Sequence, residues 1–192
     1  MPGSHMVYTG NIVFESENRK RKDRYTLKNI VLIGMPGAGK STVGVVIAKK
    51  LGYRFMDSDL VIQERTGKML HEIIEEKGTE GFLTVEGEIN ASLCCDRTVI
   101  ATGGSVVYSA KAMEHLKEIG RVVYLQLSCE AVAERLGDLQ ERGVALKEGQ
   151  TLKDLYEERT PLYERYADII LNCEGKMIRE VVAELAARLD GR

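Results

Sequence analysis

Short apolar segments alternate along the chain with longer segments whose apolar residues recur every three or four positions. Residues 30–33 form a continuous apolar run, as expected for a strand buried on both faces of a parallel sheet. Further strands are predicted at 53–56, 99–101, 122–127 and 169–171. The alternation of strands with helices predicts an α/β fold with a mainly parallel sheet.

Helices are predicted between these strands. The first has one apolar face, formed by Val43, Val46, Ile47 and Leu51. The segment 59–94 is mostly helical by composition, with breaks predicted near three glycines, Gly67, Gly78 and Gly81. Ser128 can cap a helix that runs to Leu136, and 178–189 carries the clearest amphipathic pattern of the chain.

Two polar stretches lie outside this pattern. Residues 3–6 read Gly-Ser-His-Met, typical of an expression-tag remnant, so residues 1–28 are interpreted as this remnant plus a polar extension. The remaining residues, 29–192, have the length of a single domain. Within them, about 137–150 is rich in glycine and charge and predicts a lid over a site, with a plain surface connection as the alternative.

Charge and cysteine usage exclude several classes of protein. Lys and Arg total 27 against 29 Asp and Glu, a net charge of −2, which disfavours nucleic-acid binding. The apolar run at 30–33 is far too short to span a bilayer, and the first residues lack the apolar region of a signal peptide. The four cysteines form no CxxC pair, so free thiols are expected rather than zinc. We therefore expect a cytoplasmic monomer with no nucleic-acid or membrane partner.

The segment Gly34–Ser41 matches the phosphate-binding pattern GxxxxGK[ST]. It follows an apolar strand and opens a helix, which is the context that the motif requires. Its glycines let backbone N–H groups face a phosphate at the positive end of the helix dipole. Lys40 can neutralise the β- and γ-phosphates and the Ser41 hydroxyl can bind Mg²⁺. The nucleotide-binding residues predicted from the motif are Gly37, Ala38, Gly39, Lys40, Ser41 and Thr42.

A phosphate-binding loop does not by itself define a reaction, because GTPases, motors and kinases share it. The chain has no NKxD sequence to read a guanine base, and it is small for a motor ATPase. These observations favour a kinase.

Two further segments are expected beside the phosphate-binding loop, because ligands of open α/β sheets bind at the carboxyl ends of the strands. Asp57 and Asp59 follow the second predicted strand. One could orient a Mg²⁺-bound water, and the other could align an attacking hydroxyl or accept its proton. The alternative is that either caps the following helix. Gly103 and Gly104 follow the third strand, where they would let a ligand approach the backbone or form a tight turn.

These motifs together resemble the shikimate kinase family in order and spacing over about residues 29–190. The resemblance rests on the phosphate-binding loop, FMDSD at 55–59, the glycine pair at 103–104, an arginine in the expected lid, and ERTPLYERYAD at 158–168. It implies a three-layer P-loop NTPase fold of the nucleoside-monophosphate-kinase type. Such a fold has a five-stranded parallel sheet flanked by helices, a lid and a helical region that binds the acceptor.

The resemblance also implies roles on the nucleotide side. Lys40 and Ser41 match the family's ATP and Mg²⁺ residues, and Asp57 matches the aspartate that holds Mg²⁺ through water. Arg135 matches the arginine that stacks on adenine. Arg142 matches the lid arginine that closes over the transferred phosphate.

On the acceptor side, the resemblance assigns Asp59 to the hydroxyl that is phosphorylated. Gly103 and Gly104 match the first two glycines of a substrate-binding GGG, and Arg159 matches an arginine that grips the carboxylate of shikimate. The implied reaction is transfer of the γ-phosphate of ATP to a shikimate hydroxyl, with Lys40, Asp59 and Arg142 as the catalytic residues.

Three positions depart from the family pattern. Leu83 replaces an arginine that would be a second carboxylate clamp, Ser105 replaces the third glycine, and Gly143 follows the lid arginine where a proline is usual. Because losing a buried charge-assisted contact typically costs ~2–5 kcal/mol, two alternatives stay open. The chain could phosphorylate a different small hydroxylated acceptor, or bind ATP without turnover.

Overall fold

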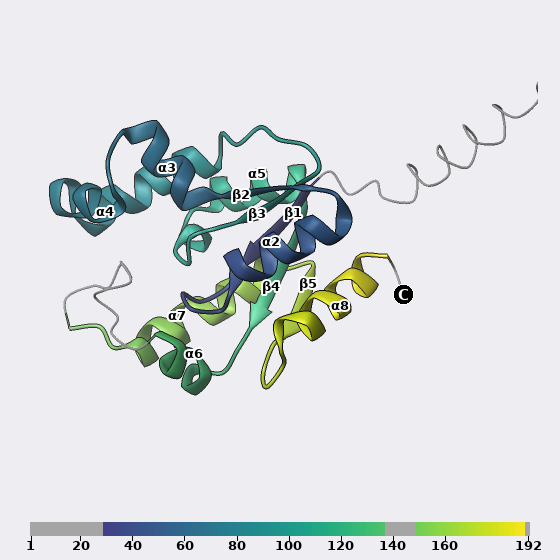
Figure 1. The fold of residues 1–192 in the computed structure, drawn as a ribbon. Coiled ribbons are helices and arrows are strands. Elements are labelled where there is room, and N and C mark those ends of the chain that lie inside the picture. The colour runs from purple at the N-terminus through teal and green to yellow at the C-terminus, as the bar shows by residue number, and fades with distance from the viewer. Residues whose placement is uncertain (1–28, 137–148, 191–192) are drawn as a thin grey trace, which may run out of the picture.

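The computed structural model describes residues 29–136 and 149–190, which form a parallel five-stranded sheet with helices on both faces (Figure 1). The strand order is β2-β3-β1-β4-β5. The strands are β1 (Asn29–Ile33), β2 (Arg54–Asp57), β3 (Thr98–Ala101), β4 (Arg121–Gln126) and β5 (Ile169–Asn172). The α/β class and the parallel sheet predicted from the sequence are confirmed.

The helices divide between the two faces of the sheet and one end of it. Helices α2 (Lys40–Leu51) and α8 (Ile178–Leu189) pack together on one face. Helices α5 (Ala110–Ile119) and α7 (Leu152–Tyr166) contact β4 from the other face, and α6 (Cys129–Leu136) packs on α7. Helices α3 (Ser58–Thr66) and α4 (Leu70–Asn90) pack on each other beside β2, and α4 also contacts α5 (Figure 1).

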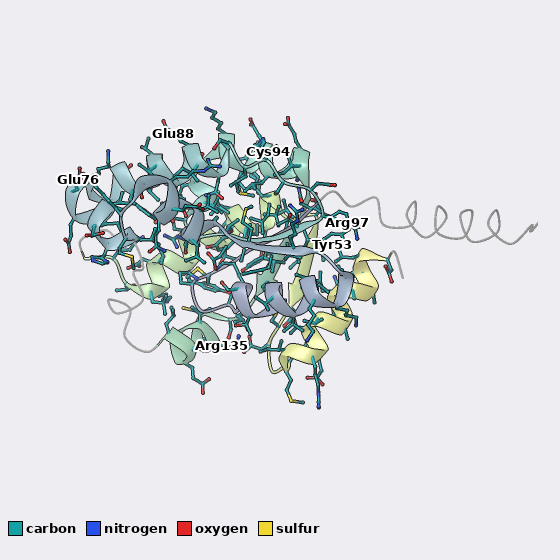
Figure 2. The ribbon with its side chains drawn as sticks, turned by 45° about the horizontal axis from the view of Figure 1, so that its top comes forward. Tyr53, Glu76, Glu88, Cys94, Arg97 and Arg135 are labelled. Atoms are coloured by element: carbon teal, nitrogen blue, oxygen red, sulfur yellow. The ribbon has the colours of Figure 1, made fainter. Side chains whose placement is uncertain are left out.

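The apolar core lies along the central strands. All five residues of β1 are buried, because strands of the sheet flank it and helices cover both of its faces. A second, smaller apolar cluster lies between α3 and α4, around Ile62, Ile73 and Phe82. Side chains fill the space between the sheet and its helices, whereas Cys94 lies exposed at the surface (Figure 2).

Several local predictions are confirmed. The N–H of Ala131 donates to Ser128 Oγ at the start of α6, Gly67 separates α3 from α4, and Gly78 interrupts α4 with a φ of 69°. The predicted break at Gly81 is wrong, because Gly81 lies inside α4. Val46 was predicted to face the core but is exposed; Gly44 takes a buried position on α2 instead, against the Phe55 ring.

The sequence patterns did not predict two features of the fold. Helix α7 buries Leu155, Arg159 and Tyr163 along one face, and the arginine in the middle of that stripe hides its apolar period. The sheet also places β3 between β1 and β2, an order that residues along the chain do not reveal.

The described part of the chain contains no disulfide, as expected, since all four cysteines are free. Each of its helices is too short or too polar to cross a bilayer.

Candidate active site

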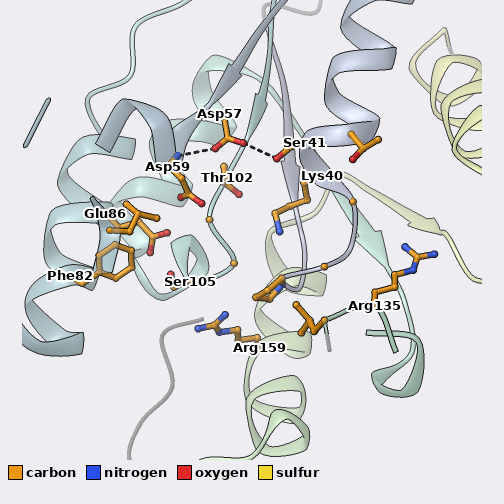
Figure 3. Close-up of a pocket in the computed structure, with 18 residues that line it drawn as sticks. Lys40, Ser41, Asp57, Asp59, Phe82, Glu86, Thr102, Ser105, Arg135 and Arg159 are labelled. Atoms are coloured by element: carbon orange, nitrogen blue, oxygen red, sulfur yellow. Dashed lines mark hydrogen bonds between the residues drawn. The ribbon is translucent and has the colours of Figure 1, made fainter. Parts of the chain in front are cut away.

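A cleft of about 390 Å³ opens where the carboxyl ends of β1, β2 and β3 meet α4 and α7 (Figure 3). Its lining joins segments that are far apart in the sequence. The side chains labelled there are Lys40, Ser41, Asp57, Asp59, Phe82, Glu86, Thr102, Ser105, Arg135 and Arg159. All the charged residues predicted for the site are among these side chains, except Arg142, which lies outside the described residues.

The phosphate-binding loop forms one wall of the cleft. Gly34, Gly37 and Gly39 have φ values of 143°, 78° and 88°, a backbone region that favours glycine. Lys40 Nζ donates to the carbonyl oxygens of Gly34 at 2.9 Å and Met35 at 3.0 Å. Burial lowers the pKa of Lys40 to about 8, although the nearby Asp59 carboxylate opposes the shift. The loop therefore holds a desolvated amine whose charged form a polyanion would favour further.

Asp57 connects this wall to the acceptor side. Its Oδ2 accepts a hydrogen bond from Ser41 Oγ at 2.7 Å, and its Oδ1 accepts one from the backbone N–H of Asp59 at 3.1 Å. Asp57 therefore caps α3 and pairs with the loop serine at the same time, so the two interpretations given to this residue are compatible. Asp59, by contrast, lies inside the first turn of α3.

The carboxyl of Asp59 points into the cleft opposite Lys40 (Figure 3). Burial raises the pKa of Asp59 to about 6, the Asp57 carboxylate adds to the rise, and Lys40 counteracts it. The positive and the negative side chain thus face a common space in which a hydroxyl and a phosphate could meet.

Arg159 closes the far end of the cleft (Figure 3). Only 2% of this residue is exposed. Its Nε donates to the Tyr108 hydroxyl at 3.1 Å, and its guanidinium lies over the Tyr108 ring, 5.1 Å from the centroid. These contacts hold the planar cation in one orientation, which suits two-point binding of a carboxylate.

The glycine pair after β3 brings these groups together. A Cβ on Gly103 would overlap Glu86 Oε1 and lie 3.0 Å from Asp59 Oδ1. A Cβ on Gly104 would lie 2.9 Å from Pro36 Cδ and 3.1 Å from Arg159 Nη1. Side chains at these positions would push apart the phosphate-binding loop, the carboxyl groups and the arginine, so the glycines shape the cleft besides forming a turn.

Comparison with known proteins agrees with this geometry. The family model described as shikimate kinase matches residues 36–190. The chain belongs to the shikimate kinase family. The shikimate kinase of Persephonella marina is 37% identical over 164 residues, which cover 85% of this chain and 99% of that protein. The shikimate kinase of Thermodesulfovibrio yellowstonii is 40% identical over 162 residues, 83% of this chain and 93% of that protein.

Solved structures of the family share the fold. The shikimate kinase of Acinetobacter baumannii in complex with shikimate has a TM-score of 0.78 and 35% identity, covering 88% of this chain and 96% of that chain. The Aquifex aeolicus shikimate kinase has a TM-score of 0.69 and 32% identity, covering 85% and 96% respectively. The family therefore establishes an enzyme that uses ATP to phosphorylate a hydroxyl.

Arg135 separates the cleft from a second hollow of about 510 Å³. The two spaces also share Gly39 and Thr42, and the second is lined on its far side by the start of α8 and by Cys173. This hollow continues the wall formed by the phosphate-binding loop and is more apolar than the cleft. Arg135, which borders both spaces, is exposed. The predicted lid, about 137–150, falls almost entirely outside the described residues.

Leu83, where the family usually has an arginine, does not face the cleft. It packs onto the small apolar cluster with Phe82 and Ile73, and the adjacent wall of the cleft is formed by Phe82 and Glu86. The interpretation that Leu83 lies against an apolar group of a different acceptor is therefore wrong for this structure. Ser105, in place of the third glycine, is buried and hydrogen-bonds the Glu86 carboxyl.

Glu86 is the acidic residue of the site that sequence reasoning missed. It is 1% exposed, and it shares the buried side of α4 with Phe82 and Asn90. The sequence does carry a signal for such a residue: Glu86 lies four positions after the apolar Phe82, on the same face of a helix. An ionisable group on a buried face indicates a functional residue, because such a group is rarely buried without a partner or a function.

Proposed function

We propose that this chain transfers the γ-phosphate of ATP to a hydroxyl of shikimate. The observation that carries the proposal is the placement of Lys40 and Asp59 across one cleft that ends at the buried Arg159 (Figure 3). The loop lysine suits a phosphate, the aspartate suits a hydroxyl and the arginine suits a carboxylate. The reaction requires the phosphate and the hydroxyl to be held in line with each other, and binding of the carboxylate fixes the orientation of the acceptor.

On the nucleotide side, the backbone N–H groups of 37–42 and Lys40 would hold the phosphates of ATP. The hollow next to Arg135 would take the nucleoside, with the guanidinium stacked on the base. Its continuity with the phosphate-binding wall at Gly39 and Thr42 supports this assignment.

Mg²⁺ fits the paired oxygens of Ser41 and Asp57. The described residues contain no cluster of three or more His, Cys, Asp or Glu side chains that could hold a metal alone, but Mg²⁺ at phosphates usually keeps waters and needs few protein ligands. Ser41 would bind the ion directly and Asp57 would hold it through water. When bound, Mg²⁺ neutralises charge on the phosphates.

On the acceptor side, Asp59 would accept a hydrogen bond from the hydroxyl that attacks, and take up its proton. Arg159 would pair with the carboxylate at the other end of the ring, beside the backbone of Gly103 and Gly104. This two-ended binding would hold the oxygen in line with the terminal phosphate, and such positioning, together with charge stabilisation, supplies most of the catalysis of phosphoryl transfer.

Arg142 and the lid keep the roles that the family resemblance implies. Arg142 would offset charge on the transferred group, and closure of about 137–150 would exclude water and so limit ATP hydrolysis. We also retain the prediction that the enzyme acts as a monomer, which light scattering in solution tests.

A coupled assay of ADP release tests the proposal. We expect turnover with shikimate at about 1–100 per second, the usual range of kinases, and little ADP release with quinate, gluconate, homoserine or nucleosides. Turnover with another compound of this panel and none with shikimate would identify a different acceptor. ATP binding without any acceptor-stimulated turnover would identify a non-catalytic module.

A further inference from the structure

Glu86 carries an unsatisfied carboxyl oxygen into the acceptor end of the cleft. The residue is 1% exposed, and its Oε1 has no hydrogen-bond partner within residues 29–136 and 149–190. In Figure 3 its side chain reaches from α4 toward the space beside Asp59. A buried polar atom in this state gains a hydrogen bond when a suitable ligand arrives.

The groups around Glu86 make it part of the acceptor site rather than of the core. Asp59 from α3 lies with it against Gly103, and Ser105 hydrogen-bonds its carboxyl. Lys40 from α2 and Arg159 from α7 are the positive charges that act on it. On its own helix, the position one turn earlier is Leu83, which packs into the apolar cluster and gives Glu86 no cation there.

We propose that Glu86 binds the acceptor directly, by a hydrogen bond between its carboxyl and a hydroxyl next to the one that Asp59 aligns. This inference rests on the proposed function and deepens it. Asp59 and Glu86 would hold two hydroxyls on one side of the ring, and Arg159 would hold the carboxylate on the other. Residue 83 is a leucine here and not the arginine that is usual in the family. The hydrogen bond between Glu86 and the acceptor hydroxyl would therefore replace part of the binding that this second cation would provide.

The protonation of Glu86 is compatible with this contact. Burial raises the pKa of Glu86 to about 7; Asp59 also raises it, while the hydrogen bond from Ser105 and the charges of Arg159 and Lys40 lower it. A neutral carboxyl can both donate to and accept from a hydroxyl. A site that hydrogen-bonds a substrate hydroxyl in this way rejects an analogue that lacks it.

The test compares two variants of Glu86 with a matched control. Glu86→Leu removes the hydrogen bond, Glu86→Gln keeps a hydrogen-bonding group, and Glu88→Gln alters an exposed glutamate of the same helix (Figure 2). We expect Glu86→Leu to raise the dissociation constant of shikimate roughly thirtyfold in calorimetry, with that of ATP changed less than twofold. Glu86→Gln should lose less, and Glu88→Gln should match the unaltered protein.

Two analogues of shikimate, each lacking one of the hydroxyls that are not phosphorylated, separate direct contact from a structural role. One should bind the unaltered protein about tenfold or more weakly than shikimate, and Glu86→Leu should bind that analogue and shikimate equally. Shikimate binding unchanged by Glu86→Leu would overturn the inference, as would an equal loss for all three ligands. If Glu86→Leu does not fold, the same comparison uses Glu86→Ala, which also removes the hydrogen-bonding group, and an unchanged ratio between shikimate and both analogues overturns it.

The two proposals fail in distinguishable ways. If the unaltered protein releases no ADP with shikimate, the proposed function fails and this inference fails with it. If the unaltered protein turns over shikimate and the Glu86 variants bind all ligands as it does, only the role of Glu86 is refuted.

Discussion

Arg159 and Glu86 are ionisable residues in the interior of the protein, where burying an isolated charge is costly. The two differ in how the surroundings compensate. Arg159 donates to Tyr108 and lies over its ring, whereas one oxygen of Glu86 has no partner among the described residues. At the scale of single residues, the acceptor end therefore combines an oriented cation with an unsatisfied carboxyl, and both can gain from a ligand that carries an acid and hydroxyls.

Arg159→Lys tests the orientation of that cation. Lysine keeps the charge but cannot donate from the Nε position to Tyr108 or present two parallel N–H groups to a carboxylate. We expect the KM for shikimate to rise roughly tenfold to a hundredfold, with the KM for ATP nearly unchanged, in steady-state assays of ADP release.

Arg165→Lys is the matched control, because Arg165 lies on the same helix, over the ring of Tyr166, but is exposed. It should change neither KM value. Equal effects of the two substitutions would show that the chemistry of the buried guanidinium does not determine acceptor binding.

At the scale of elements, α4 supplies both the small apolar cluster and one wall of the cleft. Phe82 and Glu86 line the cleft, and Leu83, between them in sequence, packs on the cluster with Ile62 and Ile73. Residues three apart on a helix are neighbours. A long side chain at position 83 would therefore lie close to Glu86, at the edge of the acceptor site.

Leu83→Arg should lower the KM for shikimate, because it adds a cation at the edge of a site whose acceptor carries a carboxylate. The same change removes a leucine from the apolar cluster, so the melting temperature should fall by a few degrees. Kinetics and thermal unfolding of the one variant measure both effects.

The double variant Leu83→Arg with Glu86→Gln is the control for the partner of the new arginine. Its KM should be higher than that of Leu83→Arg alone. A KM that Leu83→Arg leaves unchanged would mean that Arg159 alone meets the need for a cation.

At the scale of the whole molecule, the buried carboxyl of Glu86 couples stability to pH. Its pKa is raised from 4.5 to about 7 in the folded protein, chiefly by burial. The folded state therefore binds this proton more tightly than the unfolded state does. The stabilisation that it provides is complete below pH 4.5 and is lost as the pH rises toward 7.

Glu86→Gln removes this dependence. The free energy of unfolding of the variant minus that of the unaltered protein should increase from pH 4 to pH 8 by up to about 3 kcal/mol. Urea unfolding at a series of pH values measures it, with Glu88→Gln, at an exposed position of the same helix, measured in parallel. A difference that stays constant with pH would show that Glu86 titrates normally in the folded state.

The sequence by itself determined the features that depend on neighbours along the chain. The phosphate-binding loop is eight consecutive residues whose glycines adopt the positive φ values that the motif requires. The continuous apolar run at 30–33 predicted β1, because a strand covered on both faces needs no polar side, and short apolar-rich segments predicted the other four strands. A Thr151-to-Asp154 capping box was an available signal for the missed helix α7, but Arg159 interrupts its apolar stripe and Pro161 lies inside it.

Only the tertiary structure decided which side chains meet in the cleft. Placing β3 between β1 and β2 sets the glycine turn against the phosphate-binding loop, Asp59, Glu86 and Arg159 at once. A charged side chain is solvated or buried in a site according to which groups surround it, and those groups are distant in sequence. The pattern of residues along one helix carries no information about them. That is why Arg159 was predicted only through a family resemblance, whereas Asp59 was already expected from its place after the second strand, and why Glu86 was found only in the folded protein.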